Sequence, residues 1–211
     1  MTRLYCATGN PGKLREFRLA AGAAPVEIEL LPGFKEMPAC AEDGATFEEN
    51  AITKARHYGT IAVGVGHARP LLFADDSGLE VDALAGAPGV YSARYCGHHG
   101  DDPANNRLLI ERLRGVRNRT ARFVCAIALV EGGELRGVYR GAVEGLIVDE
   151  PRGDGGFGYD PHFFYPPFGR TFGEAGAEEK FAVSHRGQAL RAMLAALRST
   201  YVGVGHARPS C

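Results

Sequence analysis

Four short segments of the chain carry residues whose types and spacing could do chemistry. The first is Thr8-Gly9-Asn10-Pro11-Gly12-Lys13, which precedes a stretch of helix-forming composition. Glycines let a backbone approach an anion, the amides at the start of a helix point toward it, and a lysine adds a full positive charge. The segment lacks the spacing of a Walker A loop and of a dinucleotide-binding glycine motif. A phosphate site and an ordinary strand-to-helix turn are therefore both open.

The second segment is Asp75-Asp76-Ser77-Gly78, which follows a short apolar run. Two adjacent carboxylates repel each other unless a cation or a ligand group compensates them, and Mg²⁺ prefers one or two carboxylates together with substrate phosphates. Glu49 could add a third oxygen ligand, but Thr46 and Glu49 also have the spacing of a helix capping box. Metal binding and capping are both open for Glu49.

The third and fourth segments lie in the C-terminal part of the chain. Gly155-Gly156-Phe157-Gly158-Tyr159-Asp160-Pro161 combines two aromatic rings, which can stack on a base, with a carboxylate that can accept hydrogen bonds from one. Packing of this loop on a sheet would explain the same composition. Lys180 and Ser184-His185-Arg186 stand at the start of the last expected helix, where cations are unfavourable unless an anion lies nearby. A solvated charged face is the alternative there.

The elements that must position these segments alternate between strands and helices. The hydrophobic patterns predict strands over 3–7, 26–31, 71–74, 121–131, 134–139 and 143–148, and helices over 13–21, 47–58, 103–114 and 186–197. Gly132-Gly133 is typical of a hairpin turn. On the second helix Asn50 and Lys54 share a polar face that is free to meet a ligand. We expect an α/β protein with a mixed sheet.

Composition and charge exclude several classes of protein. With 211 residues, 45% hydrophobic and 23% charged, the chain fits a globular protein rather than a disordered or collagen-like one. A formal charge of −1 gives no global field for holding a nucleic acid. The longest apolar run, Phe123–Val130, is far shorter than the roughly 20 residues of a membrane span. With no secretory signal and no paired cysteine motif, we expect a cytoplasmic protein with reduced thiols.

One repeat lies outside this scheme. The eight letters of Val63–Pro70 recur as Val202–Pro209. We interpret them as a loop and a frayed tail, with a functional His/Arg pair as the alternative. The expected organisation is therefore one domain over residues 1–200 and a flexible tail over 201–211.

Together the four segments resemble the inosine triphosphate pyrophosphatase family, also called the Ham1-like family. The resemblance extends over nearly the whole chain. The stretches that match are Ala7–Lys13, Thr46–Ala51 with Lys54-Ala55, Ala74–Leu79 continuing to Tyr95, Gly156–Pro161, and Lys180 with Ser184–Arg186. Phe181 departs from the pattern, because many relatives carry a small or polar residue after the lysine.

The resemblance implies a long twisted mixed sheet with flanking helices that form two lobes around a nucleotide cleft, and a homodimer. It also implies Mg²⁺-dependent hydrolysis of ITP, dITP and XTP to the monophosphate and pyrophosphate. The implied triphosphate loop is Thr8, Gly9, Asn10, Pro11, Gly12 and Lys13. The implied proton acceptor is Asp76, with Glu49 and Asp76 at the metal and Ser77 at the substrate. The implied base-binding residues are Phe157, Gly158, Tyr159, Asp160, Lys180, His185 and Arg186.

Physical reasoning agrees with this resemblance. A triphosphate carries about four negative charges, and Lys13, Lys54, helix-end amides and Mg²⁺ are suitable local counter-charges. We expect Lys13 to face solvent and to contribute little to stability. Two alternatives stay open at this point: a Maf-like nucleotide pyrophosphatase and a non-catalytic nucleotide-binding module. A nucleic-acid-binding protein is disfavoured because no basic stripe occurs in the sequence.

Overall fold

A seven-stranded mixed sheet forms the centre of the protein in the computed structural model, which describes residues 2–22, 24–64, 66 and 69–202. The strands are β1 (Thr2–Cys6), β2 (Val26–Leu30), β3 (Leu71–Val81), β4 (Thr120–Glu131), β5 (Glu134–Ile147), β6 (Phe163–Tyr165) and β7 (Arg170–Thr171). Their order across the sheet is β2-β1-β3-β4-β5-β6-β7. Strand β1 runs parallel to β2 and β3, and the other neighbours are antiparallel. The expected mixed sheet is confirmed.

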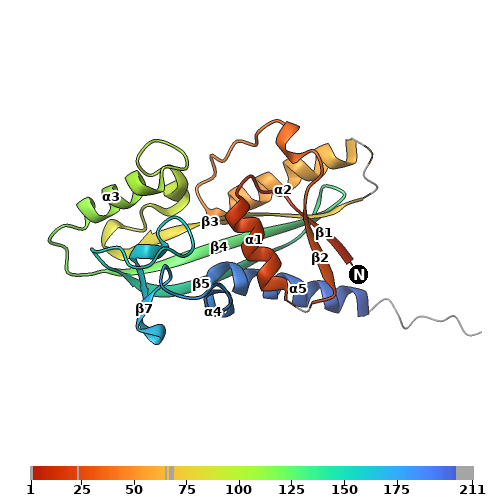
Figure 1. Ribbon diagram of the computed structural model, residues 1–211. Coiled ribbons are helices and arrows are strands. Elements are labelled where there is room, and N and C mark those ends of the chain that lie inside the picture. Colours follow the sequence, from red (N-terminus) through yellow and green to blue (C-terminus); the bar gives the residue numbers. More distant parts are fainter. Residues whose placement is uncertain (1, 23, 65, 67–68, 203–211) are drawn as a thin grey trace, which may run out of the picture.

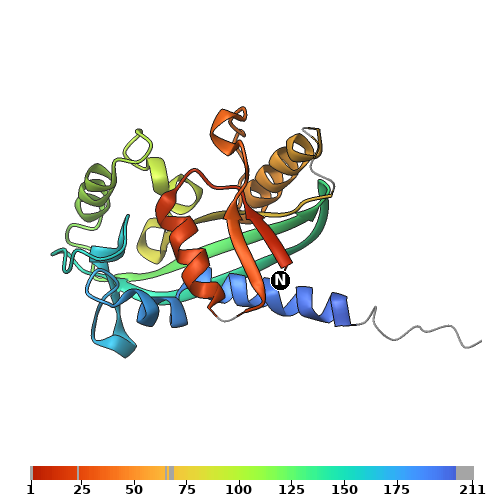
Figure 2. The same cartoon turned by 45° about the vertical axis from the view of Figure 1, so that its right-hand side comes forward.

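Helices cover both faces of this sheet. The α-helices are α1 (Pro11–Ala21), α2 (Phe47–Gly64), α3 (Asp102–Arg112), α4 (Ala177–Val183) and α5 (His185–Val202). Short 3₁₀ turns are η1 (Phe34–Glu36), η2 (Asp82–Leu84), η3 (Gly89–Arg94), η4 (Asp160–His162) and η5 (Pro166–Phe168). Helix α2 lies on one face, α5 lies on the other with α1 packed against it, and α3 lies at the far end of the long strands (Figures 1 and 2). None of the helices in the described part of the chain is long and apolar enough to cross a membrane.

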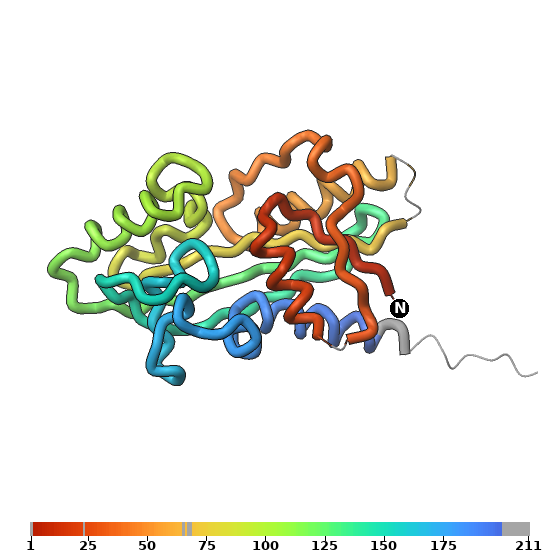
Figure 3. The backbone as a smooth tube through the Cα atoms, in the orientation of Figure 1, coloured from red at the N-terminus to blue at the C-terminus, as the bar shows by residue number. Residues whose placement is uncertain are grey.

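Three apolar cores hold these layers together. The expected stripe Phe47, Ala51 and Ala55 is buried and packs α2 on one face of β3 and β4. Leu190 belongs to the core on the opposite face, where α1 and α5 meet the sheet. Leu109 belongs to a third core beneath α3, at the other end of β3 to β5. The long strands β3, β4 and β5 run from the first two cores to the third, so two lobes share one sheet (Figure 3).

Several elements are longer than the sequence predicts. Strand β3 does not end at Ala74, because its antiparallel register with β4 continues to Val81. Residues 134–139 and 143–148, expected as two strands, belong to the single strand β5 as far as Ile147. In both cases pairing with β4 overrides the low strand propensity of Asp, Ser and Gly. Helix α2 likewise continues to Gly64, and no hydrophobic pattern in the sequence predicts α4.

The expected tail lies mostly outside the described residues. Helix α5 reaches Val202, and residues 203–211 are not described. Residues 65, 67 and 68 of the repeated segment are not described either. The interpretation of the repeat stays a prediction.

Candidate active site

Most of the residues selected from the sequence line one cleft to which both lobes contribute. Its volume is about 810 Å³, within the usual range of small-molecule sites. The selected residues that line it are Thr8, Gly9, Asn10, Pro11, Gly12, Lys13, Lys54, Asp76, Ser77, Phe157, Gly158, Tyr159, Asp160, His185 and Arg186. Two of the selected residues, Glu49 and Lys180, are not among the described residues that line the cleft. Lys180 instead bonds to Asp160, which does line the cleft, and Glu49 bonds to the backbone at the start of α2.

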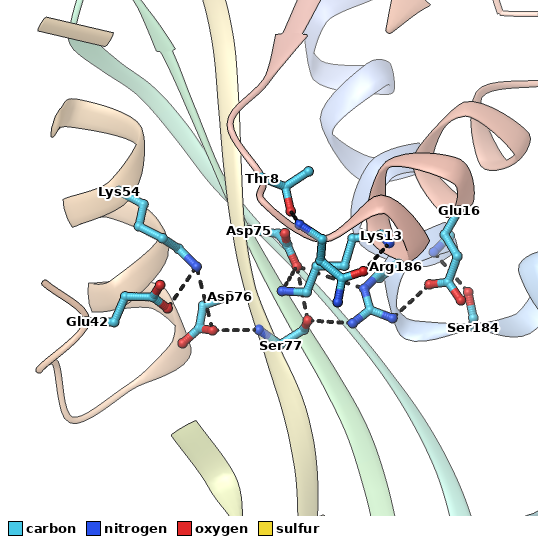
Figure 4. A network of polar contacts seen from close by, with 12 residues as sticks. Thr8, Lys13, Glu16, Glu42, Lys54, Asp75, Asp76, Ser77, Ser184 and Arg186 are labelled. Carbon is cyan, nitrogen blue, oxygen red and sulfur yellow. Dashed lines mark hydrogen bonds and ion pairs between the residues drawn. The ribbon is translucent and has the colours of Figure 1, made fainter. Parts of the chain in front are cut away.

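Asp75 and Asp76 lie side by side in the middle of β3, and they point to opposite faces of the sheet. Successive side chains of a strand alternate in this way. Figure 4 shows Asp75 directed toward Lys13 and Arg186, and Asp76 directed toward Lys54. The two carboxylates are therefore compensated separately, by cations from different helices.

Asp75 forms ion pairs with Lys13 and Arg186. Its Oδ2 lies 2.9 Å from Lys13 Nζ and accepts a hydrogen bond from Ser77 Oγ at 3.0 Å. Burial would raise the pKa of Asp75, but the charges of Lys13 and Arg186 outweigh it and lower the pKa to about 2. The Lys13 side chain is only 15% exposed, so the expectation that it faces solvent is wrong. Lys13 belongs to a buried ion pair instead.

Asp76 has the opposite electrostatic character. Asn50 Nδ2 donates to its Oδ2 at 2.9 Å, and the Ser77 amide donates to its Oδ1 at 3.0 Å. Lys54 Nζ is 3.9 Å from Oδ1. Burial raises the pKa of Asp76 and outweighs the opposing effect of Lys54. Of the two adjacent acids, Asp76 is therefore the more basic and the better proton acceptor.

Lys54 lies between two carboxylates on the α2 side of the cleft. Its Nζ is 3.0 Å from Oε2 of Glu42, a residue in the irregular segment before α2. Burial alone would lower the pKa of Lys54, but the nearby carboxylates, Asp76 first among them, raise it. Arg94 fixes the same segment by donating to the Glu42 carbonyl at 2.9 Å. Lys54 is therefore charged and held in place.

The segment from Thr8 to Lys13 forms the connection between β1 and the start of α1, as the sequence predicts. Asn10 is the N-cap of α1, and its Oδ1 accepts the Lys13 amide at 3.2 Å. The Asn10 amide donates to Thr8 Oγ1 at 3.2 Å, and Pro11 begins the helix. A helix N-terminus and a lysine thus lie together at the cleft, an arrangement that attracts anions.

The loop around Phe157 is a tight turn closed by its own carboxylate. Asp160 Oδ2 accepts the Phe157 amide at 2.9 Å. Gly156 has a positive φ of 75°, and a Cβ there would lie 1.9 Å from Asp160 Oδ2. Only glycine fits at this position.

The opposite side of this loop is bonded to α3 and η3. The Gly158 amide donates to Asp102 Oδ2 at 2.8 Å, and the Gly158 carbonyl accepts from Asn106 Nδ2 at 3.0 Å. The Tyr159 hydroxyl donates to the Ser92 carbonyl at 2.9 Å, and the tyrosine ring is buried. Phe157, which is only half-buried, is therefore the aromatic side chain better placed to stack on a base.

Glu16 joins two of the predicted cations beneath the cleft. Lys180 Nζ lies 2.9 Å from its Oε1 and Arg186 donates to its Oε2 at 2.7 Å. Burial would raise the pKa of Glu16, but these two cations lower it. Lys180 also bonds to Asp160. Lys180 thus holds the aromatic loop from behind rather than facing the cleft.

His185 and Arg186 lie at the start of α5. Arg186 donates to Ser77 Oγ at 2.8 Å, and its guanidinium carbon lies 4.9 Å from the centre of the Phe157 ring. Burial and the nearby cations, Arg186 first among them, hold the pKa of His185 well below 6.5, so the ring is neutral at pH 7. His185 Nδ1 is buried without a hydrogen-bond partner in the described part of the structure. A neutral ring with an unsatisfied nitrogen can exchange a hydrogen bond with a ligand.

Glu49 takes the capping role. Its Oε2 accepts the amides of Ala45 at 2.7 Å and Thr46 at 3.3 Å, and its own amide donates to Thr46 Oγ1 at 3.1 Å. The capping box is confirmed. Glu42 is the glutamate that lines the cleft.

The oxygen donors at the cleft fit a hard divalent cation. Asp76 and Glu42 line it, and the buried Asp75 Oδ1 has no partner among the described residues. Across those residues, no cluster of three His, Cys, Asp or Glu side chains could hold a metal alone. Mg²⁺ typically uses one or two carboxylates and completes its shell with water and substrate phosphates.

Three supporting residues escape selection from the sequence. Glu16 lies three residues after Lys13 on the same face of α1, but its partners are Lys180 and Arg186, which are distant in the sequence. Asn50 lies four residues before Lys54, and the sequence indicates only that it belongs to a polar face. Glu42 is in an irregular segment, where no periodicity marks it.

The chain is similar to proteins of known family and structure. It matches the Ham1 family model over residues 4–196. It is 50% identical over 189 residues to a dITP/XTP pyrophosphatase of an Exiguobacterium species, covering 90% of this chain and 93% of that protein. A dITP/XTP pyrophosphatase of Geobacter sulfurreducens is 50% identical over 192 residues, covering 90% and 94%. The solved HAM1 protein of Coxiella burnetii superimposes with a TM-score of 0.81 at 38% identity, covering 94% and 100%.

Proposed function

The chain belongs to the Ham1 family, and we propose that the cleft described above is its active site. The protein is a nucleoside triphosphate pyrophosphatase that hydrolyses noncanonical purine nucleoside triphosphates, the class of ITP, dITP and XTP. Its products are the monophosphate and pyrophosphate.

One observation supports this assignment of the cleft above all. Asp76, whose pKa is raised by burial, lines the same cleft as the N-terminus of α1, which is suited to phosphate, and the loop around Phe157, which is suited to a purine. Lys13 and Lys54 supply positive charge near Asp76, and Phe157 and His185 line the same cleft. This arrangement accommodates a polyphosphate and an aromatic base in one ligand.

Hydrolysis in this cleft requires a proton acceptor beside the α-phosphate. Asp76 takes a proton from the attacking water as the water oxygen bonds to the α-phosphorus. The bond from that phosphorus to its bridging oxygen breaks, and pyrophosphate leaves with the electron pair. Lys13 and Lys54 stabilise the negative charge on the phosphate oxygens.

We assign Mg²⁺ to Asp76 and Glu42, since these carboxylates line the cleft beside Lys54. Mg²⁺, when bound, would neutralise phosphate charge and orient the triphosphate. The assignment of Glu49 to the metal is retained only as the alternative that a Glu49→Gln variant tests.

The base-binding end uses stacking and hydrogen bonds. Phe157 stacks on the purine, and His185 and Arg186 face the C6 carbonyl that distinguishes hypoxanthine and xanthine from adenine. Asp160 and Lys180 hold the loop that carries Phe157. Rejection of adenine follows because its amine would leave buried donors unpaired.

We further propose a cytoplasmic homodimer of a single two-lobed domain that acts on free nucleotides and binds neither nucleic acid nor membrane. The family resemblance supports the dimer, and the formal charge of −1 supports the absence of polyanion binding. Light scattering of the purified protein tests the dimer.

Product analysis tests the activity most simply. Phosphorus NMR of an ITP reaction should show pyrophosphate and the monophosphate, dependent on added Mg²⁺. Inorganic phosphate and the diphosphate as first products would contradict attack at the α-phosphorus.

A further inference from the structure

The side chain of Asn50, in the first turn of α2, joins two parts of the cleft wall. Its Nδ2 donates to Asp76 Oδ2 at 2.9 Å. Its Oδ1 accepts the Gly44 amide at 2.9 Å. The residue is only 1% exposed, so water does not compete for either hydrogen bond. A single buried amide therefore ties β3 to the irregular segment before α2.

The contact at Gly44 is a close approach of backbone to side chain. A Cβ at Gly44 would lie 2.8 Å from Asn50 Oδ1 and 2.9 Å from Glu49 Cβ. The segment can reach Asn50 only because this position has no side chain. Glu42 is two residues earlier in the same segment, and its carbonyl is fixed by Arg94 at 2.9 Å. The backbone around Glu42 is thus held on both sides.

The two carboxylates connected through Asn50 meet at a common cation. Glu42 Oε2 lies 3.0 Å and Asp76 Oδ1 lies 3.9 Å from Lys54 Nζ. Asn50 and Lys54 are one helical turn apart on the same face of α2. Helix α2 therefore orients both carboxylates, Asp76 through a direct bond and Glu42 through the Gly44 amide.

We propose that Asn50 is a positioning residue that fixes the relative placement of Asp76 and Glu42, the two carboxylates assigned to Mg²⁺. This inference rests on the proposed function. A carboxamide suits the task because it donates at one end and accepts at the other without adding charge. Groups that orient metal ligands from behind are typically worth about 10–100-fold in metal affinity or activity.

Two variants separate the two ends of this side chain. Asn50→Ala removes both hydrogen bonds. Asn50→Asp keeps an acceptor for the Gly44 amide, removes the donor to Asp76, and places a second carboxylate against it. The matched control is Asn105→Ala, because Asn105 is also buried at 2% exposure and accepts the Cys96 amide at 2.8 Å, away from Asp76.

In both Asn50 variants, either kcat should fall by about 10–100-fold or the Mg²⁺ concentration that gives half-maximal activity should rise by that factor. The KM for ITP should stay within about threefold of the wild-type value. Binding of Mn²⁺ without nucleotide, followed by electron paramagnetic resonance, should weaken in parallel. Hydrogen exchange at the Gly44 amide should accelerate in Asn50→Ala and stay slow in Asn50→Asp. Asn105→Ala should lower the melting temperature and leave kcat and Mn²⁺ binding unchanged.

Two results would overturn the proposal. One is an Asn50→Asp variant whose kcat and Mn²⁺ binding match the wild type. The other is an Asn105→Ala control that loses as much of both as the Asn50 variants, which would reduce Asn50 to a stability role. If the wild type itself released no pyrophosphate, the proposed function would fail, while Mn²⁺ binding and Gly44 exchange would still decide the role of Asn50.

Discussion

Replacing Asp75 by asparagine should destabilise the protein in a pH-dependent way, although Asp75 is not assigned a chemical step. The substitution keeps the shape of the side chain and removes the charge that Lys13 and Arg186 face. Removal of one partner from a buried ion pair leaves the others uncompensated, which is among the more costly single changes in proteins.

The magnitude follows from the pKa of Asp75, which is lowered from 3.8 to about 2. Since one pKa unit corresponds to about 1.4 kcal/mol, the ionised form of Asp75 contributes about 2 kcal/mol to the free energy of unfolding at pH 7. The folded pKa lies below the unfolded one, so this contribution is complete above about pH 4 and is lost toward pH 2. At about pH 3 roughly half of it should remain.

Thermal unfolding in EDTA at a series of pH values measures this effect without metal. At pH 7 the Asp75→Asn variant should melt about 4–8 °C below the wild type, and the gap should narrow toward pH 3. The control is Asp149→Asn. The Oδ1 of Asp149 lies 2.7 Å from Nη1 of Arg119, but the Asp149 side chain is 59% exposed. That variant should lose less than about 1 kcal/mol. Equal melting temperatures of Asp75→Asn and the wild type at pH 7, or a gap independent of pH, would refute the reasoning.

Three further predictions concern the cap, the histidine and the base. Glu49→Gln should keep the Mg²⁺ dependence of pyrophosphate release, because glutamine can still accept hydrogen bonds from the amides of Ala45 and Thr46. A shift of the Mg²⁺ titration in this variant would instead indicate that Glu49 binds the metal. Because the pKa of His185 is held well below 6.5, the unfolded chain binds more protons in acid. The wild type should therefore lose stability from pH 7 to 5 more steeply than His185→Asn, and equal slopes in urea unfolding would show that the ring is not buried neutral. Arg186→Ala should lose kcat/KM for ITP far more than for ATP, and an unchanged ratio would place the C6 donors elsewhere.

The parts of the structure that the sequence predicts are those whose signals are local. The capping box of Thr46 and Glu49 spans four consecutive residues, and its hydrogen bonds form within that span. The turn from Thr8 to Lys13 is likewise built from its own glycines, proline and N-cap. Patterns of this length determine backbone conformation before any tertiary contact is made.

The parts that the sequence does not predict depend on distant partners. Strand β3 continues past Asp75 because β4 pairs with it across the sheet, and only that continuation directs Asp75 and Asp76 to opposite faces. Glu16 acquires its role from Arg186, which is 170 positions away in the chain. Asn50 acquires its role from Asp76, 26 positions away. No local pattern encodes such pairs, so their chemistry appears only in the folded protein.

The role of Asp76 is tested most directly by comparing the wild type with Asp76→Asn in pyrophosphate release from ITP. Asparagine preserves the shape of the side chain but cannot accept the proton of the attacking water. In this variant kcat should fall by at least about 100-fold, while ITP binding, measured by calorimetry, is largely retained. An Asp76→Asn variant with kcat within about threefold of the wild type would contradict the assignment of Asp76 as proton acceptor.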